Sequence, residues 1–165
     1  MVIIAPGHPE NRVWWTFNVD GKASPKGSKR AGRNRHTGKL MLIESAHDDV
    51  KAWQNAVIAA VWEQTQSKPE HTEVGETLVD IWFWLRRPKS VPKRRLYPIT
   101  KPDRDKLERS THDALVTARL VADDALITDG DIHKRYVHPG RPQPGATVFV
   151  ARILGLDPET QHAII

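Results

Sequence analysis

Apolar positions along the chain follow two different periods, and these periods predict the order of the elements. Residues 13–19 carry Val, Trp, Phe and Val at every second position, which is typical of a strand. Residues 77–85 show the same alternation, with apolar side chains on both faces, as in a central strand. Segments 132–137 and 147–154 lie on either side of a turn rich in Pro and Gly, so we expect them to pair as a hairpin.

Two other segments carry apolar residues at helical spacing. The first helix is expected after Ser45, which with Asp48 resembles a capping box, and to end before Pro69. The second is expected from Pro102 to about Leu120, with an apolar side that faces the core. The element order is therefore β, α, β, α, β, β, which predicts an α+β domain with helices packed on a small sheet.

Composition limits the class of protein. A chain of 165 residues is expected to form a single domain, 1–165, with a short C-terminal tail at 157–165. Cys is absent, which excludes disulfides, thiolate zinc sites and thiol nucleophiles and is consistent with a reducing cytoplasm. No apolar run approaches the roughly 20 residues of a membrane helix, and the N-terminus has no secretory signal, so we expect a cytoplasmic protein without a membrane partner.

The formal net charge of +5 is unevenly distributed. Residues 21–43 and 86–102 are basic and contain no acid, and we expect a loop over 21–38 because of its Pro and Gly content. One such run would be consistent with a solvated surface, but two that flank an acidic cluster favour contacts with phosphates. The cations that we expect to bind nucleic acid are Lys22, Lys26, Lys29, Arg30, Arg33, Arg35, Arg94, Arg95, Lys101, Lys106 and Lys134.

Four carboxylates in two short pairs are the candidate chemical groups. Asp103 and Asp105 lie in KPDRDKLERSTHDAL, and Asp123 and Asp124 lie in LVADDALI. Clustered carboxylates in a basic chain would repel a polyanion unless a cation lay between them. Mg²⁺ prefers hard oxygen ligands and also binds phosphate. The combination therefore indicates chemistry on a nucleic-acid backbone.

A structural alternative exists for the first pair. Asp103 would serve as a helix N-cap and Asp105 as a first-turn acid, because helix N-termini favour anions. Against this, Asp105, Arg109 and Asp113 are spaced by four residues and are expected to share one polar helix face.

The second pair also has a structural alternative, which is a surface turn. Adjacent residues of an extended chain point to opposite sides, so only one of Asp123 and Asp124 can easily reach a shared ion. Residues 129–131, Asp-Gly-Asp, are expected to form a simple turn, because the spacing of a calcium loop is missing. His112 is expected to have a solvated or packing role.

At these residues the chain resembles the RusA family of Holliday junction resolvases, metal-dependent endonucleases common in phages and prophages. The resemblance includes G-x-x-x-P-K-G at 21–27, the strand ending in Arg-Arg-Pro-Lys, and KPDRDKLERSTHDAL, which is similar to KPDxDNLxKxxxDAL. LVADDALI is similar to the family's second acidic motif, and Lys134 falls where the family often has Lys. The resemblance implies a two-layer α+β fold, with a small mixed β-sheet packed with two main helices.

Carried over by position, the resemblance implies a set of metal-binding catalytic carboxylates: Asp103, Asp105 and Asp124, with Asp123 as their neighbour. Arg109 occupies the place of the family's catalytic Lys, and Lys106 that of its usual Asn. Arg keeps the positive charge but holds its proton more firmly than Lys. If this position only stabilises charge, Arg109 would serve as well as Lys. If this position donates a proton, Arg109 would impair catalysis.

The expected function is that of a Mg²⁺-dependent endonuclease, with Mn²⁺ able to substitute, which resolves four-way DNA junctions. Paired cuts on two strands imply a homodimer. The expected location is the cytoplasm of a bacterium or a phage-infected cell. Two alternatives stay open: a non-catalytic DNA-binding protein that keeps the fold, which the departures at Lys106 and Arg109 favour, and a nuclease for flaps or forks.

Overall fold

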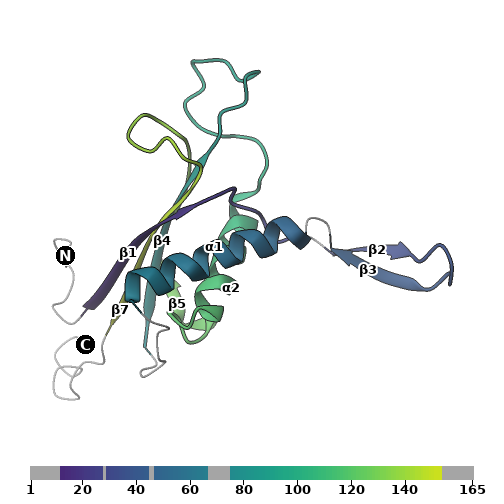
Figure 1. Ribbon diagram of the computed structural model, residues 1–165, viewed down its shortest axis with the longest axis horizontal. Helices are drawn as coiled ribbons and strands as arrows, with labels where there is room; N and C mark the ends of the chain where they lie inside the picture. The colour runs from purple at the N-terminus through teal and green to yellow at the C-terminus, as the bar shows by residue number, and fades with distance from the viewer. Residues whose placement is uncertain (1–11, 28, 45–46, 67–74, 154–165) are drawn as a thin grey trace, which may run out of the picture.

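The computed structural model describes residues 12–27, 29–44, 47–66 and 75–153. It has an α+β fold, with a mixed five-stranded sheet and two helices, as expected (Figure 1). In chain order the elements are β1 (Arg12–Asp20), β2 (Lys29–Arg33), β3 (Leu40–Glu44), α1 (His47–Thr65), β4 (Thr77–Leu85), α2 (Arg104–Thr117), the 3₁₀ turn η1 (Asp124–Leu126), β5 (Ile127–Asp129), β6 (Ile132–Tyr136) and β7 (Gly145–Ile153).

Strand β4 is the centre of the main sheet. It pairs antiparallel with β7 along one edge and parallel with β5 and β6 along the other, and β1 pairs antiparallel with β7. The expected hairpin between 132–137 and 147–154 is therefore wrong, because β6 and β7 lie on opposite sides of β4. The chain passes from β4 through α2 before it returns as β6, which is the kind of crossover that parallel pairing requires.

Both helices pack on the same face of this sheet. The core contains Val79, Ile81 and Phe83 from β4, which confirms the alternation expected for residues 77–85. Trp53 of α1 is buried and its Nε1 donates a hydrogen bond to Thr111 Oγ1 of α2 at 3.2 Å. Burying each large apolar side chain of this core stabilises the fold by roughly 1.5–3 kcal/mol.

The helices lie close to where the apolar periods place them. α1 begins at His47 and α2 at Arg104. Ser45 and Pro69, expected as the start and stop signals of the first helix, lie outside the described residues. No helix in the described part of the chain is long and apolar enough to cross a membrane.

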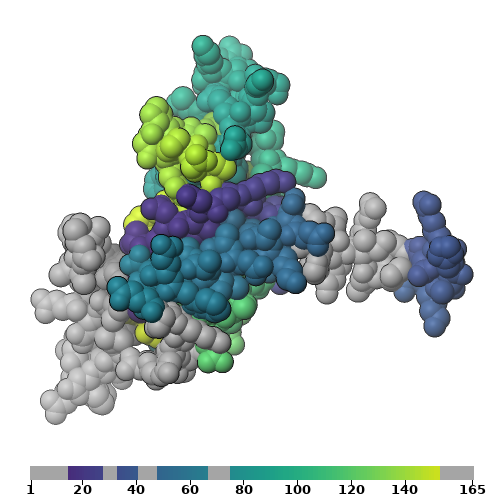
Figure 2. Space-filling view, in the orientation of Figure 1, coloured from purple at the N-terminus to yellow at the C-terminus, as the bar shows by residue number. Residues whose placement is uncertain are grey.

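The expected loop over 21–38 is in part a β-hairpin. Strands β2 and β3 form a separate two-stranded sheet, which projects away from the rest of the molecule (Figures 1 and 2). At its turn the side chain of Asn34 accepts hydrogen bonds from the backbone N–H groups of His36 and Thr37, which is typical of Asn at turns. The sequence of β2, KRAGR, has no apolar alternation, so the period gave no signal of a strand.

Residues 22–27, which precede the hairpin, have no regular secondary structure and pack against α2. Ala23 and Ser24 are buried, and the backbone N–H of Lys26 donates to the carbonyl of Lys106 at 3.0 Å.

Candidate active site

Asp103 occupies the N-cap position of α2, but its carboxylate does not cap the helix. Its backbone is extended, with φ −69° and ψ 141°, and its side chain makes no capping hydrogen bond. The carboxylate instead lies 3.3 Å from the Nζ of Lys106. The N-cap alternative is thus correct for the backbone of Asp103, whereas its side chain forms a half-exposed ion pair.

A hollow of about 430 Å³, which we call the acidic hollow, lies beside the same helix. It is lined by Val79, Asp105, Glu108, Arg109, His112, Asp124, Ile127, Thr128, Asp129 and Gly130. The structure therefore brings Asp105, Arg109 and Asp124 together from α2 and η1. Glu108, His112 and Asp129 were not assigned to the site from the sequence.

The helical residues of the acidic hollow are one face of α2. Residues 105, 108, 109 and 112 follow the i, i+3, i+4, i+7 pattern of neighbours on a helix. At about 100° per residue, position 112 lies nearly in line with Asp105, whereas position 113 is rotated by about 80°. Helical spacing measured from Asp105 thus predicts that His112, and not Asp113, shares the face of Asp105 and Arg109.

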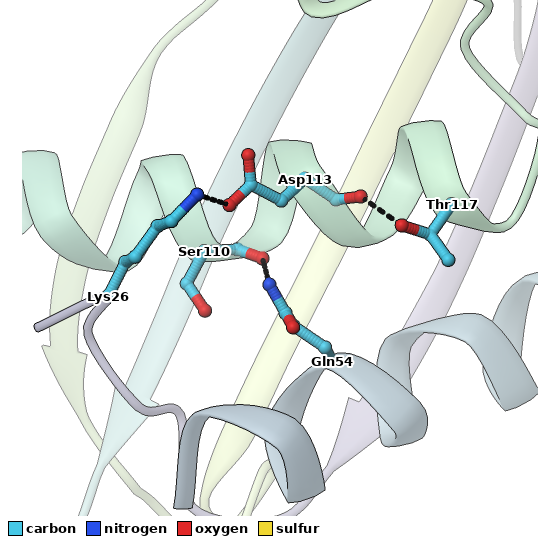
Figure 3. Close-up of polar contacts among 5 residues, drawn as sticks. All are labelled: Lys26, Gln54, Ser110, Asp113 and Thr117. Atoms are coloured by element: carbon cyan, nitrogen blue, oxygen red, sulfur yellow. Dashed lines mark hydrogen bonds and ion pairs between the residues drawn. The ribbon is translucent and has the colours of Figure 1, made fainter. Parts of the chain in front are cut away.

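Asp113 contacts a different part of the molecule (Figure 3). Its carboxylate forms an ion pair with the Nζ of Lys26 at 2.5 Å, and its carbonyl accepts a hydrogen bond from Thr117 Oγ1 at 2.8 Å. Nearby, Gln54 Nε2 of α1 donates to the carbonyl of Ser110 at 3.4 Å. Lys26, which we expected to bind DNA, is therefore engaged in a contact that holds residues 22–27 against α2.

The two adjacent acids at 123 and 124 have different roles. Asp123 is the N-cap of η1, and its Oδ1 accepts a hydrogen bond from the backbone N–H of Ala125 at 2.8 Å. Asp124 lines the acidic hollow. Only one of the pair thus faces the hollow, and Asp123 stabilises the turn that positions Asp124.

Unpaired charges surround the acidic hollow. Asp105, Arg109 and Asp124 are exposed, and the side chain of none of them has a hydrogen bond or an ion pair with another described residue. Burial lowers the pKa of His112, and the charges of Glu108, Asp124 and Asp113 oppose this shift. The Nε2 of His112 is buried and has no hydrogen-bond partner in the described part of the chain.

A larger cleft of about 830 Å³, which we call the basic cleft, lies between residues 22–27 and the base of the 86–102 loop. Asp103, Lys106, Trp84 and Tyr136 also line it. Asp103 and Asp105 therefore face different hollows, and the first turn of α2 contributes to both.

Some cations of the basic cleft are paired and others are free. Lys22 forms an ion pair with Asp49 at 2.9 Å, and both side chains are mostly exposed. Arg86 and Lys101 are exposed and make no hydrogen bond or ion pair with described residues. The cleft thus presents positive charge that a phosphate could neutralise.

Lys134 of β6 supports the backbone that leads into Asp103. Its Nζ donates hydrogen bonds to the carbonyls of Thr100 at 2.9 Å and Pro102 at 2.7 Å. Burial lowers the pKa of Lys134, while the charge of Asp103 opposes the shift. Lys134 therefore holds the loop in place.

The other cations expected to bind DNA lie on two surfaces. Arg33 and Arg35 are exposed at the tip of the hairpin, and Lys29 and Arg30 belong to β2, where their side chains lie outside the described residues. On the 86–102 loop, Arg94 is exposed and Arg95 is half-buried.

The donors of the acidic hollow were tested for their fit to a divalent metal. No group of three or more His, Asp or Glu side chains among the described residues is placed to hold a metal ion. Mg²⁺, however, is commonly held by one or two carboxylates together with waters and substrate phosphates. Asp105 and Asp124 supply two such carboxylates, so the donor chemistry fits Mg²⁺. A shared ion for Asp103, Asp105 and Asp124 stays a prediction.

Unpaired carboxylates next to a cationic cleft are typical of an enzyme that acts on a phosphate backbone. The family model of Endodeoxyribonuclease RusA matches residues 22–148, so this chain belongs to the RusA family. The chain is accordingly an endodeoxyribonuclease of the kind that resolves Holliday junctions in branched DNA. No curated protein matches the chain.

Proposed function

We propose that this chain is a Mg²⁺-dependent, structure-selective endonuclease that resolves four-way DNA junctions by hydrolysing phosphodiesters in two strands. One observation carries the proposal: Asp105 and Asp124, from separate elements, face one hollow beside Arg109 and have no partner among the described residues. Two carboxylates that face the same hollow concentrate negative charge there, and Mg²⁺ prefers such hard oxygen ligands.

Each group of the site has a chemical role in the proposal. Asp105 and Asp124 would hold Mg²⁺ or Mn²⁺, and Asp103, two residues before Asp105, lines the adjoining basic cleft. When bound, the metal supplies an activated water and offsets negative charge on the reacting phosphate. Arg109 stabilises that phosphate through its fixed guanidinium donors and needs to release no proton. Lys101 and Arg86 hold the adjoining strand in the basic cleft.

The cleavage assay tests this assignment. The protein is incubated with an end-labelled four-way junction, a flap, a fork and a duplex, each with Mg²⁺ or with EDTA. We expect symmetric cuts in the four-way junction when Mg²⁺ is present and no cuts in EDTA. Preferred cleavage of flaps or forks would redirect the proposal to those substrates.

Asp105→Asn should abolish cleavage while junction binding persists, because Asn keeps the shape of Asp but loses its charge. Asp131→Asn is the matched control, since Asp131 is exposed and does not line the acidic hollow. Full Mg²⁺-dependent activity in Asp105→Asn would contradict the assigned role.

A homodimer is part of the proposal, because paired cuts need two sites related by a twofold axis. Analytical ultracentrifugation of the protein, free and bound to a junction, checks this. We place the activity in the cytoplasm of a bacterium or a phage-infected cell, a setting with which the absence of Cys agrees.

A second candidate function is junction binding without cleavage. The Nζ of Lys106 lies 3.3 Å from the Asp103 carboxylate, where it supplies a positive charge of its own. If this ion pair excludes the metal, the protein will bind junctions tightly and cut none in either Mg²⁺ or Mn²⁺.

A further inference from the structure

The loop over residues 86–102 is held in shape by cations that point inward. The Nη2 of Arg87 donates to the carbonyls of Pro92 at 2.7 Å, Lys93 at 3.1 Å and Arg95 at 2.5 Å. The same guanidinium lies 4.8 Å from the centre of the Tyr136 ring. The loop, seen at the top of Figures 1 and 2, is therefore stabilised by its own side chains.

The end of the loop is held in the same way. Arg135 of β6 lies with its guanidinium 4.8 Å from the Tyr97 ring centre, and Lys134 bonds the carbonyls of Thr100 and Pro102. Pro98 is buried. Residues 96–102 thus have a fixed backbone path that ends at the acidic residues of the site.

Three large apolar side chains of this loop remain in solvent. Leu96 is 69% exposed, Tyr97 53% and Ile99 72%. We call these three residues the apolar tip. They lie in a segment with cations and no acid, namely Arg86, Arg87, Lys89, Lys93, Arg94, Arg95 and Lys101. Neighbouring exposed apolar side chains on an otherwise charged surface commonly mark a binding site.

We propose that Leu96 and Ile99 stack against bases exposed at the branch point of a DNA junction, while the surrounding cations contact its phosphates. This inference rests on the proposed function and adds how the branch point is recognised. Leu and Ile are among the apolar side chains that insert as wedges between base steps in other DNA complexes.

The charge of the loop favours DNA over a second copy of this chain. In a twofold contact between two such loops, the exposed cations of one loop would face those of the other with no acid of the loop between them; these cations are Arg86, Lys89, Lys93, Arg94 and Lys101. DNA offers both complements at once, because phosphates match the cations and unpaired base faces match the apolar tip.

The apolar tip is also close to the site along the chain. Ile99 is four residues from Asp103, so the two Cα atoms are separated by at most about 14 Å. At about 3.4 Å per nucleotide along a strand, this distance corresponds to about four nucleotides. The contacted base and the strand in the basic cleft beside Asp103 are therefore expected within about four nucleotides of each other.

The test uses full-length Asp105→Asn protein in EDTA, so that binding is measured without cleavage. A four-way junction and a duplex of matched sequence each carry 2-aminopurine, whose fluorescence rises when it leaves the base stack, at the branch point or its equivalent. The test variant carries Leu96→Ser and Ile99→Ser in addition to Asp105→Asn. The control adds Leu40→Ser, because Leu40 is 73% exposed but lies on the projecting hairpin.

We expect the fluorescence rise at the branch point to be lost in the double-serine variant and kept in the control. Junction affinity should fall about tenfold, with duplex affinity unchanged, because two apolar side chains would no longer be buried against bases. An unchanged fluorescence rise and junction preference would overturn the proposal. So would dissociation of a dimer in the double-serine variant, which would assign the apolar tip to contacts between copies.

Failure of this proposal and failure of the proposed nuclease function give different experimental results. Absence of cleavage by the wild-type protein in Mg²⁺ would refute the nuclease assignment, yet the fluorescence result in EDTA would still decide whether the apolar tip contacts bases.

Discussion

Lys106 stands where the family motif has Asn, and its Nζ lies 3.3 Å from the carboxylate of Asp103. Both side chains are partly exposed, so the pair contributes at most about 1 kcal/mol. A cation at this place competes with a metal ion for Asp103. At the scale of single residues, this ion pair should therefore raise the Mg²⁺ concentration that cleavage requires.

Lys106→Asn should lower the Mg²⁺ concentration for half-maximal cleavage by up to about fivefold, the equivalent of about 1 kcal/mol. Titration of the initial cleavage rate against Mg²⁺ measures the shift. Lys51→Asn removes the same charge from an exposed position of α1 and should leave the value unchanged. An equal or higher Mg²⁺ requirement in Lys106→Asn would show that the pair does not oppose the metal.

The second prediction at the residue scale concerns His112 and the pH dependence of the free energy of unfolding. Burial lowers its pKa in the folded protein, so below about pH 6.5 the unfolded chain binds the proton more readily. Its contribution to stability is therefore present above that pH and is lost as the pH falls. His112→Gln should reduce the loss of unfolding free energy between about pH 7.5 and pH 5.

Urea unfolding in EDTA at several pH values measures the effect of His112→Gln. His36→Gln on the hairpin is the matched control, because His36 is exposed. If the two variants show the same pH dependence as the wild type, burial of His112 does not affect stability.

At the scale of elements, the break between β5 and β6 shapes one wall of the acidic hollow. Gly130 occupies this break with φ +139°, and a Cβ there would lie 2.0 Å from the carbonyl oxygen of Val79. Backbone atoms cannot move away easily, because Val79 belongs to the central strand β4. The break thus requires Gly, and a side chain would displace Asp129 and the strand beside it.

Gly130→Ala should reduce the free energy of unfolding by about 2–4 kcal/mol. Gly38→Ala should cost only about 1–2 kcal/mol, since Gly38 has φ +68° but no atom within 4 Å of the added Cβ. Urea denaturation of both variants provides the comparison. Equal losses of unfolding free energy in the two variants would mean that β5 can shift to accommodate the added Cβ. The close approach of Gly130 to Val79 would then not affect stability.

The elements show how far the sequence predicts this fold. Helices α1 and α2 and strand β4 lie where the apolar periods place them, because each buries one face in the core. The pairing of β6 with β4 was not predictable, since periodicity reports which side chains are buried and not which strand lies alongside. The hairpin was not predicted because β2, KRAGR, has no apolar alternation and the surrounding Pro and Gly favour a loop.

The candidate site shows the same limit. The motifs select Asp105, Arg109 and Asp124, which the structure brings to one hollow. They do not select Glu108 or Asp129, whose positions depend on the face of α2 and on the end of β5. The direction of Asp103 toward Lys106 depends on side-chain geometry at the helix start, which spacing alone does not specify.

At the scale of the whole molecule, two segments that carry exposed cations project in different directions: the hairpin tip and the 86–102 loop (Figure 1). A four-way junction has arms that diverge from one point, so two separated basic surfaces could hold different arms. Each phosphate contact that is lost should reduce the slope of log affinity against log salt by about 0.9.

Replacing Arg33, Arg35 and Lys39 by Gln should therefore reduce the slope for junction binding by about 2–3. Replacing Lys89, Lys93 and Arg94 by Gln should do the same, and the two losses should add in the sixfold variant if the surfaces bind separate arms. On a duplex shorter than the span between the surfaces, only one set of contacts can form, so the losses should not add. If the reductions in salt slope add on both the junction and the short duplex, the two surfaces bind the same stretch of DNA. The different directions of the hairpin and the loop would then have no role in selecting a junction.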